Sequence, residues 1–308
     1  MLRVGEEKAT EFVGVNWGSS NFRAYRIRGD GVLLDQWIQP AGVSGMDKAS
    51  MAGLIEELDA RWAGHGPIYA CGMIGSNIGW QEVPYALAPA GLAKISETTV
   101  HTHIGNVQVR IVPGVTCKRT FDGGPDILRG EEIELFGFST IQSGFDGLLA
   151  LPGTHTKWVM FHSGHVHDFF TSMSGEIYDR LTAAGLLAST VEGEANLNDA
   201  FEGGVRLGQE RTLGLGTLLF GARAKVIRGE LKRRDASSYI RGLLIGAEIA
   251  DALAIYPQLQ GTTIPLIGNE ALSVLYAAAL ASVGIKSSLV SSKDACLSGF
   301  LALHRACE

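Results

Sequence analysis

Hydrophobic and polar positions in the first third of the chain predict a short run of strands interrupted by one helix. Apolar or alternating stretches mark strands, and a Gly-Asp-Gly cluster at 29–31 is typical of a tight turn between two of them. Residues 47–62 carry hydrophobic side chains at the three-and-four spacing of a helix. The expected elements are strands at 12–17, 22–27 and 32–38, a helix at 47–62, and strands at 67–73 and 107–115.

The second half of the chain repeats this opening. A shift of 135 positions places Gly18 on Gly153 and the turn glycine Gly29 on Gly164. Around these glycines the order of strand, polar turn, strand, glycine turn, strand and helix recurs. The repeat predicts an internal duplication and two α/β domains, 1–143 and 144–308.

Helical patterns dominate the region between the repeated hairpin and the C-terminal part of the chain. Ser237 or Ser238 is the expected N-cap of the last of these helices. Strands that alternate with helices predict mixed-to-parallel sheets covered by helices. The expected elements are strands at 148–151, 158–162 and 166–173, helices at 175–187, 199–210, 217–234 and 237–255, a strand at 262–268, and helices at 269–281 and 294–306.

Composition narrows the classes of protein. Glycine makes up 40 of 308 residues without a three-residue period, and 46% of residues are hydrophobic, which excludes collagen and disorder. A net charge of −6 argues against nucleic acid as a partner. Four dispersed cysteines exclude a zinc ribbon. With no apolar stretch of about 18 residues and no apolar signal segment, a cytoplasmic protein without membrane partners is expected.

Both repeated hairpins carry glycine and hydroxyl residues at the tip. Small residues let backbone N–H groups converge on an anion, although one such tip alone is more often an ordinary turn. Two such tips at equivalent positions of the repeated hairpins favour a polyphosphate site instead. The sequence contains neither a P-loop motif nor a dinucleotide-binding fingerprint. The predicted phosphate ligands are Gly18, Ser19, Ser20, Asn21, Gly153, Thr154, His155, Thr156 and Lys157.

Several segments resemble a known family. Paired phosphate hairpins in duplicated domains are typical of the superfamily of sugar kinases, actin and heat-shock chaperone ATPases, and the chain most resembles 2-dehydro-3-deoxygalactonokinases. The segments that carry the resemblance are NWGSSNFRAY (16–25), CGMIGSNIGWQEVPY (71–85), PDILRGEEIELFG (125–137), LPGTHTKWV (151–159), LLIGAEIADAL (243–253) and PLIGNEAL (265–272).

The resemblance implies an α/β fold of duplicated actin-like, ribonuclease H-like domains with a nucleotide cleft between them. The implied reaction is ATP-dependent phosphorylation of the terminal hydroxyl of a six-carbon keto-deoxy sugar acid in galactonate catabolism, with Mg²⁺. The first domain would hold one phosphate loop, the sugar acid and the catalytic base. The second would hold the other loop and the adenosine, and the last helix could pack back on the first domain.

Phosphoryl transfer needs a group that accepts the proton of the attacking hydroxyl. Asp126 is the expected base, because the sequence places it at the start of a helix, where the dipole favours an ionised carboxylate. Pro-Asp is also a common helix cap, and Glu131 is the second candidate, as base or metal-linked carboxylate. The family usually has aspartate where this chain has Asn16, so a water-mediated Mg²⁺ contact there is expected to be weakened.

Substrate contacts are predicted at the turn after the fourth strand. Paired glycines can offer N–H groups to a carboxylate, and nearby polar groups can hold hydroxyls. The same residues also fit a packed strand-to-loop turn, and Arg23 also fits a solvent-facing strand position. The predicted substrate residues are Arg23, Gly72, Met73, Gly75, Ser76, Trp80, Gln81 and Glu82.

The remaining features leave alternatives open. Gly268 and Asn269 resemble an adenosine contact, but they equally fit a helix cap. His162, His165 and His167 are interpreted as exposed turn residues and not as a metal cluster. A catalytically weakened nucleotide-binding regulator and a kinase for another sugar or sugar acid remain alternatives. The stereochemistry of the sugar acid and the oligomeric state are not encoded in recognisable motifs.

Overall fold

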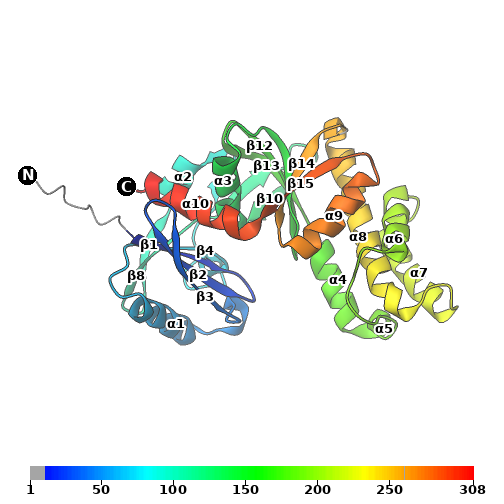
Figure 1. Cartoon of the computed structure of the whole chain (residues 1–308), viewed down its shortest axis with the longest axis horizontal. Helices are drawn as coiled ribbons and strands as arrows, with labels where there is room; N and C mark the ends of the chain where they lie inside the picture. Colours follow the sequence, from blue (N-terminus) through cyan, green and yellow to red (C-terminus); the bar gives the residue numbers. More distant parts are fainter. Residues whose placement is uncertain (1–10, 260) are drawn as a thin grey trace, which may run out of the picture. The chain divides into compact units, whose positions relative to one another are not determined.

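A computed structural model describes residues 11–259 and 261–308, which divide into two compact units (Figure 1). Unit 1 comprises the described residues up to 146 together with 161–168 and 292–308, and unit 2 comprises 147–160 and the described residues from 169 to 291. The division falls within one hairpin, whose tip is counted with unit 1.

Unit 1 contains short strands and four helices among its described residues. Its strands are β1 (Glu11–Trp17), β2 (Phe22–Arg28), β3 (Leu33–Gln39), β4 (Ile68–Gly72), β5 (Ala86–Leu87), β6 (Ala90–Gly91), β7 (Val100–Ile104), β8 (Val107–Ile111), β9 (Val115–Lys118) and β10 (Pro125–Leu128). Its helices are α1 (Lys48–Arg61), α2 (Leu92–Glu97), α3 (Glu131–Ile141) and α10 (Ser292–Ala306), with 3₁₀ turns η1 (Val43–Gly45) and η2 (Met73–Gly75).

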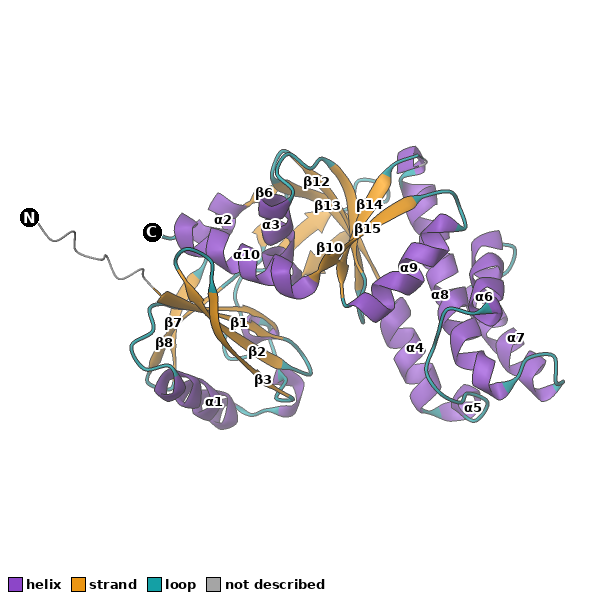
Figure 2. Ribbon diagram, viewed as in Figure 1, coloured by secondary structure: helices purple, strands orange, loops and turns teal. Residues whose placement is uncertain are grey.

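Unit 2 is richer in helix (Figure 2). Its strands, including the hairpin that the division cuts, are β11 (Gly147–Leu151), β12 (Thr156–His162), β13 (His165–Ser172), β14 (Thr263–Gly268) and β15 (Lys286–Ser291). Its helices are α4 (Ser174–Ala183), α5 (Gly185–Ala188), α6 (Asp199–Glu210), α7 (Leu215–Ile227), α8 (Arg233–Ile255) and α9 (Glu270–Ala281), with the 3₁₀ turn η3 (Pro257–Leu259).

The two main sheets share five strands in the same order, which confirms the predicted α/β duplication. Each sheet has one further strand, β7 beside β8 in the first and β6 beside β13 in the second. The first runs β3-β2-β1-β4-β8-β7, and the second contains β13-β12-β11-β14-β15. In the first, β1 pairs antiparallel with β2 and parallel with β4, and β4 pairs parallel with β8. In the second, β14 pairs parallel with both β11 and β15. Each unit thus places a hairpin beside two further parallel strands.

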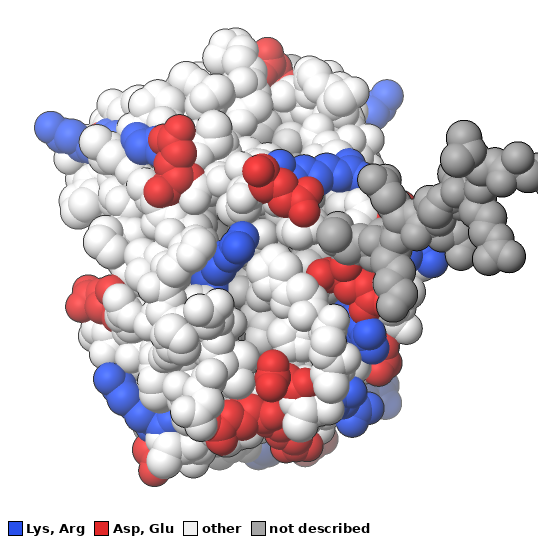
Figure 3. Space-filling view, turned by 90° about the vertical axis from the view of Figure 1, so that its left-hand side faces the viewer, with Lys and Arg blue, Asp and Glu red and all other residues white. Residues whose placement is uncertain are grey.

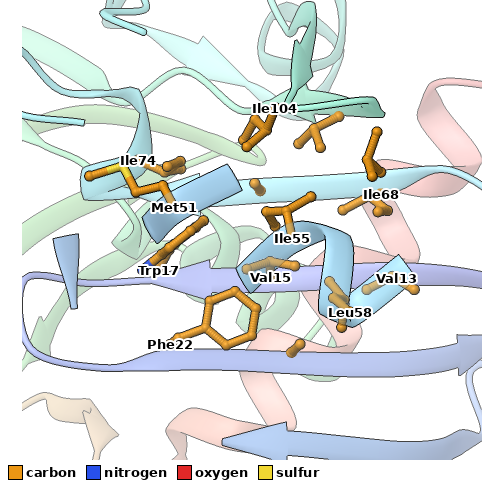
Figure 4. Packing of buried hydrophobic residues seen from close by; sticks show 14 of the residues in the cluster. Val13, Val15, Trp17, Phe22, Met51, Ile55, Leu58, Ile68, Ile74 and Ile104 are labelled. Atoms are coloured by element: carbon orange, nitrogen blue, oxygen red, sulfur yellow. The ribbon is translucent and has the colours of Figure 1, made fainter. Parts of the chain in front are cut away.

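The core of unit 1 lies between the first sheet and α1 (Figure 4). Val13, Val15 and Trp17 alternate along β1, and Met51 and Ile55 point to them from α1. All five side chains are at most 1% exposed. The alternating strand pattern and the helical pattern read from the sequence therefore meet in one buried layer.

Helices α6 and α8 pack side by side through glycines, which accounts for part of the glycine excess (Figure 2). A β-carbon built on Gly204 would lie 2.1 Å from the Tyr239 carbonyl oxygen, and one on Gly242 would lie 2.1 Å from the Phe201 carbonyl oxygen. Real Cβ atoms never approach backbone so closely, so the helices can touch only because both positions lack a side chain.

Three local predictions are wrong for tertiary reasons. The expected strand 107–115 is divided into β8 and β9, and Gly114 between them packs closely against the Leu128 carbonyl. Residues 125–128 form β10, paired antiparallel with β9, where a helix start was expected. The long helix begins at Arg233, so Ser237 and Ser238 lie buried inside α8 rather than at its cap. Ser237 is hydrogen-bonded to Tyr178.

Helix α10 returns to unit 1, where it packs against α3 (Figure 1).

Among the described residues, no helix combines the length and hydropathy needed to cross a bilayer. On the face drawn in Figure 3, acidic and basic side chains are interspersed rather than segregated by sign.

Candidate active site

The tip of the β1–β2 hairpin is held in place by hydrogen bonds that other residues donate to its backbone carbonyl groups. The N–H groups of Val43 and Ser44 donate to the carbonyls of Gly18 and Ser19, at 3.0 and 3.2 Å. Within residues 11–259 and 261–308, no acceptor is recorded for the N–H groups of Ser19 and Ser20. A backbone turn with occupied acceptors and free donors suits an anion.

Gly42 allows this arrangement, because it sits directly against the tip. A β-carbon at Gly42 would lie 2.0 Å from the Ser19 carbonyl oxygen. Any larger residue would push the tip away from η1. Gly42 is not among the residues predicted from the sequence, because its partner Ser19 is more than twenty residues away in the chain.

The tip of the β11–β12 turn repeats this construction in unit 2. Glu176 donates its N–H to the Thr154 carbonyl at 2.9 Å, and a β-carbon at Gly175 would lie 2.2 Å from the Gly153 carbonyl oxygen. In the described part of the chain the N–H groups of Thr154 and His155 likewise have no recorded acceptor. Both tips that the sequence selected therefore have occupied carbonyl groups and free backbone N–H groups.

A buried carboxylate anchors the second tip. The Gly153 N–H donates to the Thr156 hydroxyl at 3.4 Å. The Thr156 hydroxyl is in turn 2.8 Å from the Tyr276 hydroxyl. The Tyr276 hydroxyl in turn donates to Glu248, with oxygen separations of 3.1 and 3.0 Å. The carboxylate also accepts from Trp158 at 2.7 Å and from Ser174. A directed chain of hydrogen bonds thus runs from the tip to Glu248.

Glu248 is 3% exposed, and burial raises the pKa of its carboxyl, while hydrogen bonds from Ser174 and Trp158 act in the opposite direction. Loss of this acceptor would leave several buried donors unpaired. The segment around Glu248 carried no predicted role, because the Glu248 partners Trp158, Ser174 and Tyr276 come from three distant elements, β12, α4 and α9.

Three predicted phosphate ligands of the second hairpin are engaged elsewhere in the structure. Thr156 is fully buried in the network just described. Lys157 lies within β12, and its Nζ donates to the Thr171 hydroxyl at 2.8 Å. His155 Nε2 is 2.6 Å from Glu176 Oε2, and this hydrogen bond is the largest of the effects that lower the pKa of Glu176. Gly153, Thr154 and the backbone N–H of His155 remain at the tip itself.

The N-terminus of α3 lies against the carboxyl ends of β1 and β4. Gly72 pairs with Trp17 across these strands, and a β-carbon on Gly130 would be 3.2 Å from the Gly72 Cα. Both glycines have positive φ, 91° and 106°, which favours glycine at each position. Helix α3 therefore begins where the first phosphate tip leaves the sheet.

Glu131 is the first residue of α3, and its Oε2 accepts the Arg129 N–H at 2.8 Å. Burial raises the pKa of the Cys71 thiol well above its usual value, and the charges of Glu132, Glu134 and Glu131 add to the effect. Cys71 is the β4 partner of Asn16. Glu131 thus stands in the same neighbourhood as the residue where the family usually has aspartate.

Asn16 and Arg23 face each other in the β1–β2 register. Asn16 hydrogen-bonds the Cys296 thiol, whose pKa burial raises strongly. Desolvation raises the pKa of Glu134 to about 7, against the opposing effects of the hydrogen bond from Ser292 and of the positive charge of Arg23. Glu134 accepts this bond from Ser292 at 2.6 Å. The structure therefore places Arg23 beside acidic and thiol groups of unit 1.

Asp126 does not open a helix. It lies in β10, its Oδ1 accepts the Ile127 N–H at 2.8 Å, and its Oδ2 is 3.5 Å from Arg119. The helix-dipole argument for Asp126 is consequently wrong, because strand pairing with β9 overrides the Pro-Asp cap signal. That argument applies to Glu131 instead.

The predicted substrate turn is ordered by its own backbone. Met73–Gly75 form η2, and Ser76 donates both its N–H and its hydroxyl to the Met73 carbonyl. Trp80 packs on the core, and its indole N–H donates to the His103 carbonyl at 2.9 Å. Gln81 and Glu82 are exposed. The turn is compact, and its ligands stay predictions.

Gly268 and Asn269 lie beside the second phosphate tip. A β-carbon on Gly268 would be 3.3 Å from the Pro152 carbonyl oxygen, so the end of β14 touches the residue before Gly153. The Asn269 side chain accepts the Leu272 N–H at 2.8 Å and caps α9. The cap is therefore real, and the adenosine contact stays a prediction.

The described residues contain no group of three or more His, Cys, Asp or Glu side chains suited to a metal ion. His162 instead lies 3.1 Å from Asp146 and stacks edge-on with His167. One surface pocket of about 460 Å³ is lined by none of the predicted site residues; it is formed by Pro89, Gly91, Leu92, Ala93, Lys94, Glu97, Gly164 and His165.

Two sheets that share five strands in one order, each with a glycine-hydroxyl tip, define a duplicated actin-like α/β fold. Component A of (R)-2-hydroxyglutaryl-CoA dehydratase from Acidaminococcus fermentans shares this fold at a TM-score of 0.50 and 12% identity, covering 97% of this chain and all of that one. Such a distant likeness shows the fold alone.

Closer comparisons define the family. The 2-keto-3-deoxy-galactonokinase family model matches residues 16–303. The 2-dehydro-3-deoxygalactonokinase of Escherichia coli K12 is 32% identical over 296 residues, covering 96% of this chain and 98% of that protein. A crystal structure of a Sinorhizobium meliloti protein assigned as a 2-dehydro-3-deoxygalactonokinase superposes with a TM-score of 0.87, at 33% identity and 96% coverage of both chains. The chain belongs to the 2-keto-3-deoxy-galactonokinase family, as the resemblance indicated, and is a sugar-acid kinase.

Proposed function

We propose that this kinase transfers the terminal phosphoryl group of ATP to the 6-hydroxyl of 2-dehydro-3-deoxy-D-galactonate in galactonate catabolism. The observation that carries the proposal is the meeting of three features at one edge of the first sheet. The free N–H groups of the first tip, the N-terminus of α3 and the turn that begins at Gly72 all follow the carboxyl ends of β1 and β4. This edge is where open α/β sheets bind their ligands.

Glu131 is the proposed base in preference to Asp126. It stands in the first turn of α3, where the helix dipole stabilises an ionised carboxylate. In this role Glu131 accepts the proton of the 6-hydroxyl as the oxygen attacks the γ-phosphorus. Asp126 remains the second candidate, although its carboxylate is already engaged with the Ile127 N–H and Arg119.

ATP fits the donor set of the two tips. Free N–H groups at Ser19, Ser20, Thr154 and His155 match phosphate oxygens, and the glycines behind the tips keep their carbonyls turned away. The other predicted phosphate ligands, Gly18, Asn21, Gly153, Thr156 and Lys157, shape or flank these tips.

Magnesium would neutralise charge on the phosphates during transfer. Mg²⁺ usually keeps several waters and needs few protein ligands, so a site without a carboxylate cluster is compatible with it. Asn16 offers one neutral amide oxygen at the end of β1. We therefore propose a water-mediated contact at Asn16 that is weaker than an aspartate would give.

The remaining assignments follow the same logic. The sugar acid is assigned to unit 1 and the adenosine to unit 2, with Gly268 and Asn269 beside its tip. The proposed substrate residues are Arg23, Gly72, Met73, Gly75, Ser76, Trp80, Gln81 and Glu82. A cytoplasmic site of action and domains at 1–143 and 144–308 complete the proposal.

Coupled ADP release with 2-dehydro-3-deoxygalactonate, its gluconate-derived epimer, glucose and N-acetylglucosamine tests the proposal. Turnover should be largest with the galactonate-derived acid and require ATP. Turnover that is larger with glucose or N-acetylglucosamine would contradict the proposed substrate. ATP binding without turnover of any substrate would indicate the regulatory alternative.

A further inference from the structure

Arg129, which precedes α3, has a guanidinium fixed in position but incompletely paired. Its Nη2 donates to the Val83 carbonyl at 2.7 Å, and its Cζ lies 4.1 Å from the centroid of the Tyr85 ring. Nη1 sits against Gly75, where a β-carbon would approach it to 2.8 Å. The glycine of the predicted substrate turn thus makes room for this side chain.

Two of its three nitrogens lack an acceptor. Nε and Nη1 are buried, and neither makes a hydrogen bond in the part of the chain that the structure describes. Buried donors are nearly always paired, because an unpaired one costs roughly 1–3 kcal/mol. The residue as a whole is half-buried, although these two nitrogens are not exposed.

The charge of Arg129 is also unbalanced. No ion pair to it is found within residues 11–259 and 261–308. The Glu131 carboxylate accepts a hydrogen bond from the backbone N–H of Arg129, not from its guanidinium. Burial raises the pKa of Glu132 to about 8, so this carboxyl is mainly protonated at neutral pH and does not neutralise the guanidinium. A fixed cation with free donors calls for an anionic partner.

We propose that Arg129 binds the carboxylate of the sugar-acid substrate, with Gly75 and Tyr85 holding the guanidinium in place. The inference rests on the proposed function and adds a residue that determines acid specificity. A carboxylate is favoured over an ATP phosphate because Arg129 touches the Gly75 turn and Val83, and neither phosphate tip.

The test compares Arg129→Gln, Arg129→Lys and wild type in steady-state kinetics. Arg129→Gln should raise the KM for 2-dehydro-3-deoxygalactonate by about 10- to 100-fold, the range for a lost charge-assisted hydrogen bond, and leave the KM for ATP within about twofold. Arg129→Lys keeps the charge and should recover part of the loss. Wild type should also prefer the acid over the neutral analogue in which CH₂OH replaces the carboxylate, and Arg129→Gln should lose most of that preference.

Arg110 provides a matched control, since it also lies over a tyrosine, Tyr69, at 5.3 Å and donates to its hydroxyl. Arg110→Gln should leave the acid preference unchanged. An unchanged KM for the acid in folded Arg129→Gln, or a rise in the KM for ATP alone, would overturn the inference. Wild type without activity on any sugar acid would instead contradict the proposed function. If Arg129→Gln does not fold, equal wild-type turnover of the acid and its neutral analogue would still refute the inference.

Discussion

Replacement of Glu248 by alanine tests whether the second phosphate tip depends on a buried carboxylate. The carboxylate accepts from Trp158, Ser174 and Tyr276, all inside unit 2. Alanine would leave three buried donors without their acceptor, at roughly 1–3 kcal/mol each. Because some donors can re-pair, we expect the free energy of unfolding to fall by about 3–5 kcal/mol, as for other broken buried charge networks.

Urea denaturation followed by circular dichroism measures this loss directly. Glu202→Ala is the matched control. Glu202 is a glutamate on a unit 2 helix whose one ion pair within residues 11–259 and 261–308 is an exposed contact of 3.9 Å with Arg206. This variant should change stability by less than about 0.5 kcal/mol. The isosteric Glu248→Gln should fold and raise the KM for ATP more than that for the sugar acid. A loss below about 1 kcal/mol in Glu248→Ala would refute the account of the network.

Three further variants test separate parts of the structure. Burial raises the pKa of Glu132 from 4.5 to about 8, so its contribution to stability is present below pH 4.5 and is lost as the pH rises through 8. Glu132→Gln should remove about 4–5 kcal/mol of this loss of stability, measured as the free energy of unfolding at a series of pH values. Parallel curves of unfolding free energy against pH for the variant and the wild type would contradict this prediction. Gly242→Ala should separate α6 from α8 and lower stability by about 1–3 kcal/mol in thermal or urea unfolding, whereas an unchanged midpoint would show that the helices are not in contact there. Asn16→Asp should lower the Mg²⁺ concentration needed for half-maximal rate, and no decrease would argue against a metal contact at this position.

The repeated hairpins were predictable because local signals specify them. Period-two alternation, a glycine-hydroxyl tip and a glycine turn each act over a few residues, and their recurrence after 135 positions marks the duplication. The order of the five strands that the two sheets share follows from that repeat. Both tips have the form expected of anion sites, although their ligands stay predictions.

The secondary-structure predictions that are wrong concern segments whose conformation depends on contacts with other parts of the chain. Pro125-Asp126 has the composition of a helix start, but pairing with β9 makes it a strand and moves the helix start to Glu131. Ser237 and Ser238 are typical N-cap residues, yet they lie buried inside α8, where they are hydrogen-bonded to Tyr178 and Asn196.

The residues that support the hairpin tips and the proposed carboxylate contact have no recognisable signal in the local sequence. Gly42 and Gly175 matter because each touches a hairpin tip, and Arg129 matters because its donors lack acceptors. None of these facts can be read from neighbours in the chain. Sequence reasoning found the segments that contain Glu248 and Arg129 but could not assign them a role.

The central claim is that Glu131, at the start of α3, serves as the base of a sugar-acid kinase. The most direct measurement is the rate of ADP release with ATP, Mg²⁺ and 2-dehydro-3-deoxygalactonate in wild type, Glu131→Gln and Asp126→Asn. The account predicts that Glu131→Gln lowers kcat by roughly 10²–10⁴-fold with ATP affinity retained, as expected for a lost general base, and that Asp126→Asn retains most of the rate. A near-normal kcat in Glu131→Gln, together with a collapse in Asp126→Asn, would contradict it.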